Sequence, residues 1–391
     1  MGRVKTPLQE NGAVPTRPTI LILSFSPIAT DARVLKQIAV ARELGDVVTC
    51  GYGPAAEGVL EHVRIPDALA IYPLSPKLLV LRLGRLALRR APAITWVRRS
   101  LSGRSFDAVI ADDLEAAPTG LSIRADCGHL LDLHEYTPRL HDESAGWRRY
   151  LQPLFESVAR RVLPRASAVT TVGGLIAEQY ERLSGVLPQV VVNAAPFADL
   201  RPGEVGGTIR LVHSGACLRN RGLIELVTAV EHSATPLTLD LFLMPNDPAH
   251  LEELRSLARG SSRVTVHDPV PYARLIGTLN DFDLGVHVLP PVTINNEWAL
   301  PNKFFDYVQA RLGVIVGPSP EMARYAAEHE LGLVTAGFSA ADLTATLDSL
   351  SLERVRALKA AAHRAAPSLS SEHAMGPWRE GLRTMLERAR S

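Results

Sequence analysis

The amino-acid sequence predicts an α/β protein of two domains, each built on a parallel sheet. Short aliphatic runs alternate with longer segments of helical period along the chain, which is typical of parallel strands joined by crossover helices. The chain has 391 residues, more than one hydrophobic core usually supports. Hydrophobic residues make up 46% of it and charged residues 21%, as in globular proteins.

The first sheet is expected to begin at residue 19, where the aliphatic run Thr19–Leu23 predicts a buried strand. The segment Arg33–Leu44 has helical period and is followed by a glycine, which suits a helix end. Further strands are predicted at Val47–Cys50, Ala108–Ala111 and His129–Leu133. We expect residues 1–18, which have few large apolar groups, to form a flexible leader, and residues 19–200 to form the first domain.

A second series of strands follows the polar, glycine-bearing stretch 201–208, where we place the domain boundary. These strands are predicted at Arg210–His213, Thr238–Leu243, Arg263–Val266, Leu284–Val288 and Val314–Val316. Residues 201–370 are expected to form the second domain. Because ligands bind at the carboxyl ends of parallel strands, two such domains predict a site in the cleft between them.

Composition excludes several classes of function. The 42 basic residues nearly cancel the 41 acidic ones, so no global field favours nucleic acid. The three cysteines, Cys50, Cys127 and Cys217, are widely spaced, which argues against a disulfide framework or a structural zinc site and fits a reducing cytoplasm. The N-terminus lacks a secretory signal, and no stretch reaches about 18 uninterrupted apolar residues. A cytoplasmic location is therefore expected.

One segment is strongly basic. Residues 77–104 contain eight Lys or Arg side chains and no acidic one, interleaved with leucines and Trp96. Such a pattern is common on solvated helices, which is the interpretation we favour. The alternative is a weak peripheral contact with anionic lipid at the inner face of the membrane, or guidance of an anionic acceptor.

Residues Ala299–Tyr307, with the sequence ALPNKFFDY, predict a helix that begins at Asn302 or Lys303, with Asn302 as a favoured cap. A helix N-terminus presents free N–H groups and a partial positive charge, and Lys303 adds a full charge, which together suit a diphosphate. Asp306 lies one turn inside, where its carboxylate could accept hydrogen bonds from a ribose diol. The alternative is an ordinary capped helix with a surface lysine.

Two further segments suit the same ligand. The strand at residues 210–213 leads through Gly215 into a loop with Arg219 and Arg221, and arginine binds phosphate through two parallel hydrogen bonds. A strand that breaks at Pro269 and Pro271 leaves the Val270 backbone free to bond a flat base edge. Surface arginines and plain loop residues are the alternatives.

In the first domain, His134 and Glu135 follow a buried strand at its carboxyl end, where sites are built. Asp31 and Arg33 open the first helix, and Asp113 follows the strand that ends at Ala111. Each also has a structural explanation, since Asp31 and Glu135 are suitable helix caps and a lone histidine is often structural.

Taken together, LPNKFFDY, the run GVIVG at Gly313–Gly317 and the following Pro320-Glu321-Met322 resemble the donor-binding half of family 4 glycosyltransferases of the GT-B fold. The resemblance spans about residues 19–388. It implies two Rossmann-like domains facing a central cleft, with the helix around Trp378 and residues 371–391 returning to the first domain. It also implies a retaining, metal-independent enzyme without cofactors. Such an enzyme moves a sugar from a UDP or GDP sugar to a small-molecule, glycan or lipid-linked acceptor.

The resemblance assigns roles to individual residues. His134 would orient the sugar or acceptor with help from Glu135, and Asp31, Arg33 and Asp113 would contact the acceptor. The donor would be bound by Gly215, Arg219, Arg221, Val270, Asn302, Lys303, Phe304 and Asp306. Asp306 replaces the family's usual glutamate. Trp298 stands where a second glutamate normally contacts the sugar, which leaves that contact unassigned.

Three other classes of protein are alternatives to a glycosyltransferase. A nicotinamide dehydrogenase is excluded, because the loop Ser24–Asp31 contains none of the three glycines that a dinucleotide fold needs. A sugar-nucleotide epimerase of the same fold stays open. So does a non-catalytic glycosyltransferase homologue that acts as a partner subunit.

Overall fold

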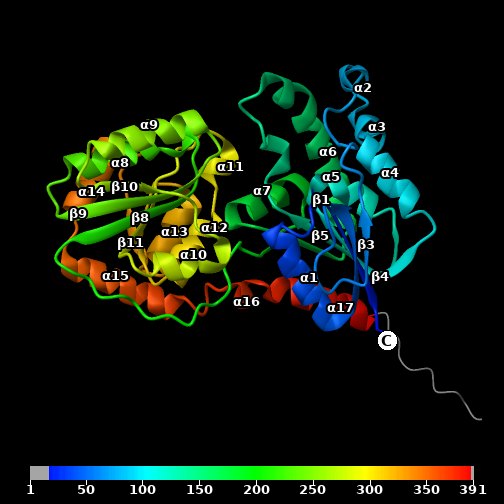
Figure 1. The fold of residues 1–391 in the computed structure, drawn as a ribbon. Coiled ribbons are helices and arrows are strands. Elements are labelled where there is room, and N and C mark those ends of the chain that lie inside the picture. The colour runs from blue at the N-terminus through cyan, green and yellow to red at the C-terminus, as the bar shows by residue number, and fades with distance from the viewer. Residues whose placement is uncertain (1–16, 389–391) are drawn as a thin grey trace, which may run out of the picture.

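The structure is a computed structural model that describes residues 17–388. Of the predicted leader only residues 17 and 18 lie within the described part, and the predicted C-terminal segment is described as far as Arg388. Two separate parallel sheets are formed, one from each half of the chain (Figure 1). Among the described residues no helix is long and apolar enough to cross a membrane.

The first sheet has seven parallel strands in the order β3-β2-β1-β4-β5-β6-β7. Its strands are β1 (Thr19–Pro27), β2 (Asp46–Tyr52), β3 (Glu61–Arg64), β4 (Ser105–Asp112), β5 (Arg124–Leu133), β6 (Ala168–Thr171) and β7 (Gln189–Val190). The helices of this half are α1 (Ala32–Leu44), α2 (Pro76–Val80), α3 (Gly84–Arg89), α4 (Pro92–Ser100), α5 (Asp113–Gly120), η1 (Thr137–Arg139), η2 (Trp147–Leu151), α6 (Gln152–Val162), η3 (Leu163–Arg165) and α7 (Gly174–Ser184).

The second sheet has six parallel strands in the order β10-β9-β8-β11-β12-β13. Its strands are β8 (Ile209–Ala216), β9 (Leu237–Met244), β10 (Val264–His267), β11 (Leu284–His287), β12 (Gly313–Val316) and β13 (Gly332–Val334). The helices are η4 (Arg219–Arg221), α8 (Leu223–His232), α9 (Pro248–Arg259), α10 (Tyr272–Leu279), α11 (Ile294–Glu297), α12 (Asn302–Gln309), α13 (Pro320–Glu328), α14 (Ala340–Asp348) and α15 (Leu352–Ala365).

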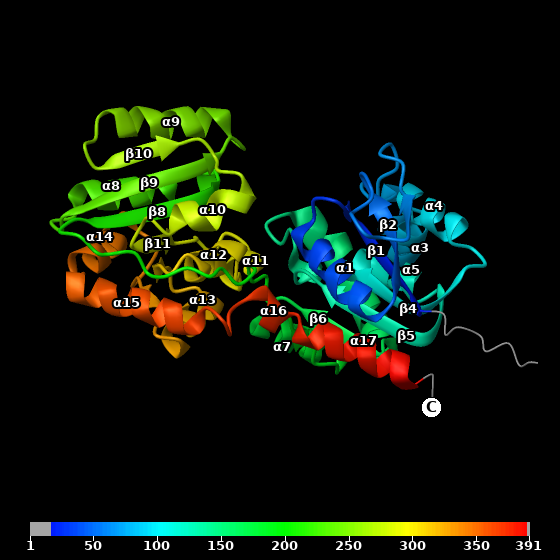
Figure 2. The same ribbon diagram turned by 60° about the horizontal axis from the view of Figure 1, so that its bottom comes forward.

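The chain then returns to the first sheet through α16 (Ser371–Ala374) and α17 (Gly376–Arg388), as Figure 2 shows. Trp378 and Leu382 are buried in the core that contains Ile20 and Leu130 of the first sheet. The returning segment is hydrogen-bonded to the outgoing one, because the Ser371 N–H donates to the Ala195 carbonyl at 2.8 Å. The chain therefore crosses between the two domains twice, and the two crossing segments lie side by side.

Alternating parallel strands and helices confirm the predicted fold class. Every strand named from the sequence is present, although most are longer than predicted, β1, β4, β5 and β8 by four residues or more. The strands that the pattern missed, β3, β6, β7 and β13, have two to four residues each. Three of them, β3, β7 and β13, lie at sheet edges. Runs this short carry too little periodicity to be recognised.

Candidate functional site

A pocket of about 520 Å³ lies at the carboxyl ends of the strands of the second sheet, beside the N-terminus of α12. Its volume is within the range of about 300 to 1,000 Å³ that small-molecule sites occupy. We call it the donor pocket. It is lined by Ser214, Gly215, Ala216, Arg221, Phe242, Met244, Pro269, Val270, Tyr272, Leu275, His287, Leu289, Asn296, Ala299, Pro301, Asn302, Lys303 and Asp306.

Two positive charges meet at one end of the donor pocket. The Lys303 ammonium approaches the backbone of Gly215 so closely that a Cβ at position 215 would lie 2.7 Å from Nζ. Arg221 lines the same wall, and within residues 17–388 neither side chain forms an ion pair. The first N–H groups of α12 lie beside them. This end therefore offers two unneutralised cations and a helix N-terminus to an anion.

The pKa values of Lys303 and Arg221 are both shifted in this pocket. Burial, and then the neighbouring Arg221 guanidinium, lower the pKa of Lys303 to about 8. Burial also lowers the pKa of Arg221. A bound diphosphate would reverse both effects, because an opposite charge favours the protonated cations.

Asp306 also lines the pocket, one turn inside α12, as the sequence predicts. Its side chain is buried, and the Tyr272 hydroxyl donates to Oδ1 at 3.3 Å. Burial raises the pKa of Asp306 to about 6, although Tyr272, Lys36 and Lys303 oppose the shift. Lys36 reaches this region from α1 of the first domain and was not singled out from the sequence.

Two buried histidines lie beneath the cations, and sequence reasoning did not assign them a role. His287 lines the donor pocket, and its ring centroid is 5.8 Å from that of His213. His213 Nδ1 donates to the Val286 carbonyl at 2.8 Å, and within the described residues His213 Nε2 and His287 Nδ1 have no hydrogen-bond partner. Burial, and then Lys303, lower the pKa of His213 to about 3, so both rings are neutral. His287 ends a buried strand, and that position is the signal that could have identified it.

Val270 also lines the donor pocket, between Pro269 and Tyr272, just past the end of β10. The neighbouring residues His267 and Asp268 are engaged elsewhere, with Asp240 at 2.6 Å and Arg255 at 2.8 Å. The break in the strand thus brings an apolar, proline-bounded turn to the pocket.

Two predicted donor residues lie outside the donor pocket, and a third lines it but does not cap α12 as expected. Arg219 does not line the pocket and instead pairs with Glu253 at 3.0 Å and Asp247 at 3.5 Å. Phe304 is fully buried and its ring packs on Phe305, so it supports α12 from the core side. Asn302 is the first helical residue and makes no side-chain cap, because Pro301 takes the cap position.

Trp298, which replaces the expected glutamate, belongs to the contact between domains. Its ring lies edge-on to Tyr136 at a centroid distance of 5.9 Å. Nearby, Asn295 Oδ1 accepts a hydrogen bond from the Tyr136 N–H at 2.9 Å. The segment around α11 therefore holds the second domain against the residues that follow β5.

A second pocket, also of about 520 Å³, lies at the carboxyl ends of the strands of the first sheet. We call it the acidic pocket, because five of its side chains are carboxylic acids and the histidine is its only basic group. It is lined by Ser24, Phe25, Ser26, Asp31, Tyr52, Asp67, Leu69, Ala70, Ile71, Tyr72, Asp112, Asp113, Glu115 and His134. Two predicted acceptor residues, Asp31 and Asp113, are among them. Asp31 also caps α1 by accepting from the Arg33 and Val34 N–H groups.

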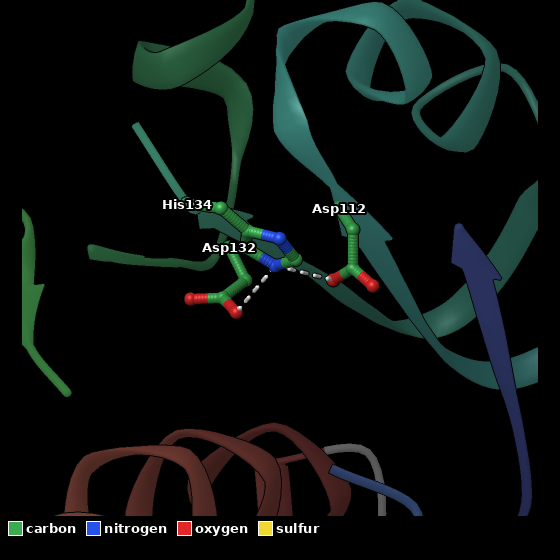
Figure 3. A group of neighbouring side chains, drawn as sticks. All are labelled: Asp112, Asp132 and His134. Carbon is green, nitrogen blue, oxygen red and sulfur yellow. Dashed lines mark ion pairs between the residues drawn. The ribbon is translucent and has the colours of Figure 1, made fainter. Parts of the chain in front are cut away.

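Three carboxylates surround His134, and Figure 3 shows two of them, Asp112 and Asp132. Its Nδ1 lies 3.3 Å from Asp113 Oδ2, and its Nε2 lies 3.2 Å from Asp132 Oδ2 and 3.8 Å from Asp112 Oδ1. Burial alone would lower the pKa of His134, but Asp113 and the other two carboxylates raise it well above the ordinary value. This direction favours the protonated imidazole, in which both ring nitrogens are potential hydrogen-bond donors.

Asp112, Asp132 and His134 also lie close enough together to be considered as metal ligands. The donor set does not fit a metal, because both oxygens of Asp132 already accept hydrogen bonds from Arg33, each at 2.7 Å. Gln37 and Thr170 donate to the same carboxylate, at 2.7 and 2.6 Å. The protonated His134 would in addition have to lose its proton.

The remaining two predicted residues of the first domain do not line either pocket. Arg33 is buried under α17, with its guanidinium 4.7 Å above the Trp378 ring and in an ion pair with Asp132. It therefore positions Asp132, and this buried placement does not support the predicted contact with an acceptor. The Glu135 backbone carbonyl accepts a hydrogen bond from the Tyr180 hydroxyl at 2.8 Å, and burial, and then Asp113, raise the pKa of the Glu135 carboxyl group to about 7.

Two parallel α/β domains, with the last helix returned to the first, make up the GT-B fold. Solved structures share it over nearly their whole length. HepE from Anabaena, crystallised with UDP, matches with a TM-score of 0.68 and 15% identity, covering 94% of this chain and 100% of that chain. Sucrose-phosphate synthase from Thermosynechococcus elongatus matches with a TM-score of 0.66 and 14% identity, covering 96% and 100%.

Trehalose 6-phosphate synthase from Burkholderia multivorans is similar as well, with a TM-score of 0.65 and 12% identity over 96% of this chain and 99% of that chain. No protein-family model matches the sequence, and no curated protein matches it either. At these identities the likeness establishes the fold, and the function must be argued from the site.

Proposed function

We propose that this chain transfers a sugar from a nucleotide diphosphate sugar to an acceptor. The observation that carries the proposal is the donor pocket, where Lys303, Arg221 and the start of α12 meet and where neither cation forms an ion pair within residues 17–388. A diphosphate would neutralise these charges, while Asp306 in the same pocket could accept hydrogen bonds from a ribose. The similar HepE structures were solved with UDP and with UDP-glucose, which agrees with such a ligand.

The base would lie against the Pro269–Val270 turn, and backbone contacts there favour no particular base. We expect a UDP or GDP sugar. The acceptor would enter from the acidic pocket, where protonated His134 can donate to the sugar or to the acceptor and so orient them. The acceptor in this proposal is a small molecule, a glycan or a lipid-linked sugar.

The chemistry that fits this site is transfer with retention and without a metal. The bond from the anomeric carbon to the leaving phosphate oxygen breaks, and a bond to the acceptor oxygen forms on the same face. The acceptor proton passes to the leaving diphosphate. Lys303, Arg221 and the helix N-terminus would stabilise the charge that develops on that diphosphate.

A thermal-shift panel of UDP, GDP, ADP, CDP and TDP tests the donor class, because a ligand of the folded state raises its stability. Calorimetry then tests the site. Lys303→Ala and Arg221→Ala should each weaken binding by about 1.5 to 3 kcal/mol, as expected for charge-assisted hydrogen bonds. Arg219→Ala is the matched control, because Arg219 belongs to the same loop but lies outside the pocket. Equal losses for Arg219 and Arg221, or none, contradict the assignment.

Two other activities predict different products. An epimerase would convert the donor to an isomer without an acceptor, and a non-catalytic homologue would bind nucleotide without turnover. A transferase releases the nucleoside diphosphate only as the acceptor is consumed. His134→Asn should lower that turnover while leaving the dissociation constant of the free nucleoside diphosphate unchanged, because His134 lies outside the donor pocket.

A further inference from the structure

The basic segment 77–104 takes no part in either pocket described above. It folds into the short helices α2, α3 and α4, which lie beside α6 and α5 on one side of the first domain (Figure 1). Between them is a pocket of about 270 Å³ with an apolar floor that includes Leu88, Ile94 and Val158. Five arginines from four elements, α3, α4, α6 and η3, line it: Arg85, Arg89, Arg98, Arg161 and Arg165. We call it the arginine pocket.

The arginines of this pocket are not neutralised. Within residues 17–388 none of the five forms an ion pair, and Arg98 donates only to the Ser122 hydroxyl at 3.2 Å. Elsewhere in the same domain arginines do find carboxylates, as in Arg104 with Glu61 and Arg139 with Asp142, both at 2.7 Å. Because like charges repel, five unpaired guanidinium groups around one hollow indicate an anionic ligand.

The one acidic group in the arginine pocket, Glu115, does little to offset this charge. The Tyr72 hydroxyl donates to its Oε1 at 2.8 Å. Burial, and then Asp113, raise the pKa of Glu115 to about 7, so it is only partly ionised at neutral pH. Glu115 also lines the acidic pocket, so the two pockets adjoin at this residue.

We propose that the arginine pocket binds a phosphate group, carried either by a lipid headgroup or by a soluble phosphate ester. Guanidinium groups bind phosphate oxygens through two parallel hydrogen bonds, and several in one concave site discriminate against weaker anions. Val80, Leu81 and Leu83, which are 64%, 66% and 46% exposed on the adjoining α2–α3 segment, give a lipid an apolar contact. The proposal stands independently of glycosyl transfer.

Two probes separate the sources of phosphate. Calorimetry with glycerol 3-phosphate measures binding of a soluble ester, and sedimentation with phosphatidylcholine vesicles, with and without phosphatidylglycerol, measures binding of a headgroup. The test variant is Arg89→Gln with Arg161→Gln. The matched control is Arg90→Gln with Arg99→Gln, which removes the same charge from exposed arginines that do not line the pocket.

The full-length protein should bind at least one probe, and the Arg89/Arg161 variant should bind it at least about tenfold more weakly, a change equal to one charge-assisted contact. The Arg90/Arg99 variant should bind as the parent does. Binding of neither probe, or equal losses in both variants, would overturn the proposal. The proposal would also be overturned if Lys303→Ala abolished binding of the probe while the Arg89/Arg161 variant kept it. The probe would then bind in the donor pocket.

Thermal unfolding checks that the variants are folded. Should the double variant unfold, Arg165→Gln alone provides the test, because Arg165 is exposed and forms no ion pair in the described chain. A loss of about threefold or more with this single change would support the site, and unchanged binding would overturn it.

Discussion

The Lys303 ammonium rests against Gly215, where a Cβ would lie 2.7 Å from Nζ. Gly215 also has φ +138°, a backbone conformation that side chains rarely adopt. The glycine therefore keeps open the space that the cation occupies, so that two segments 88 residues apart in sequence form one wall of the donor pocket.

Gly215→Ala should displace Lys303 and weaken nucleotide diphosphate binding by about tenfold, which calorimetry measures. Gly206→Ala is the control, because Gly206 has open space around its Cα and an ordinary backbone. If the two alanine variants bind alike, Lys303 is not held where the ligand needs it.

Donor binding should be bell-shaped with pH. The ligand prefers protonated Lys303, whose pKa is about 8, so affinity falls as pH rises above that value and the ammonium is lost. The ribose needs ionised Asp306, whose pKa is about 6, so affinity falls again below that value. A nucleotide sugar should be titrated rather than a free nucleoside diphosphate, because its phosphates do not themselves titrate between these values. A dissociation constant that is flat from pH 5 to 9 contradicts both roles.

Asp306 should distinguish ribose from deoxyribose. The parent protein is expected to bind a nucleoside diphosphate more tightly than its 2′-deoxy form, and Asp306→Asn should remove most of that preference. Competition measurements with the two nucleotides give the ratio directly. Tyr272→Phe removes a hydrogen bond that lowers the pKa of Asp306 and should move the acid limb of the pH profile upward.

The Arg33–Asp132 pair should contribute to folding rather than to ligand binding. Both side chains are buried, and Trp378 of the returning helix α17 lies over the Arg33 guanidinium. Arg33→Met leaves the Asp132 carboxylate buried without its partner and should lower the free energy of unfolding by about 3 to 5 kcal/mol. Denaturant unfolding measures this, with exposed Arg42 on the same helix changed to methionine as the control. Loss of activity without loss of stability would instead favour an acceptor role for Arg33.

Local patterns were enough to predict the fold class and much of the donor pocket. Pro301 and Gly215 restrict the backbone where they stand, and Lys303 carries a charge at a helix N-terminus. Their effects can therefore be predicted from the local sequence. The fate of Arg219 and Arg221 could not be read in this way. They are two residues apart, yet Arg221 lines the pocket whereas Arg219 pairs with Glu253 of α9. This difference depends on how α9 packs in the tertiary structure.

The same limit applies to the first domain. Arg33 and Asp132 are 99 residues apart in sequence, and only the packed sheet shows that they neutralise one another. The five arginines of the arginine pocket come from segments that the sequence pattern treats separately. The basic segment 77–104 could be recognised in the sequence. Only the tertiary structure shows that its arginines share a pocket with Arg161 and Arg165.

The double passage of the chain between the domains has a mechanical consequence. The outgoing segment near Ala195 and the returning helix α16 are hydrogen-bonded side by side, and the Phe197 N–H donates to Glu372 Oε2 at 2.9 Å. Two adjacent covalent connections permit bending about the place where they meet and resist torsion of one lobe against the other. Cleavage of either connection alone would leave the lobes tethered through the other.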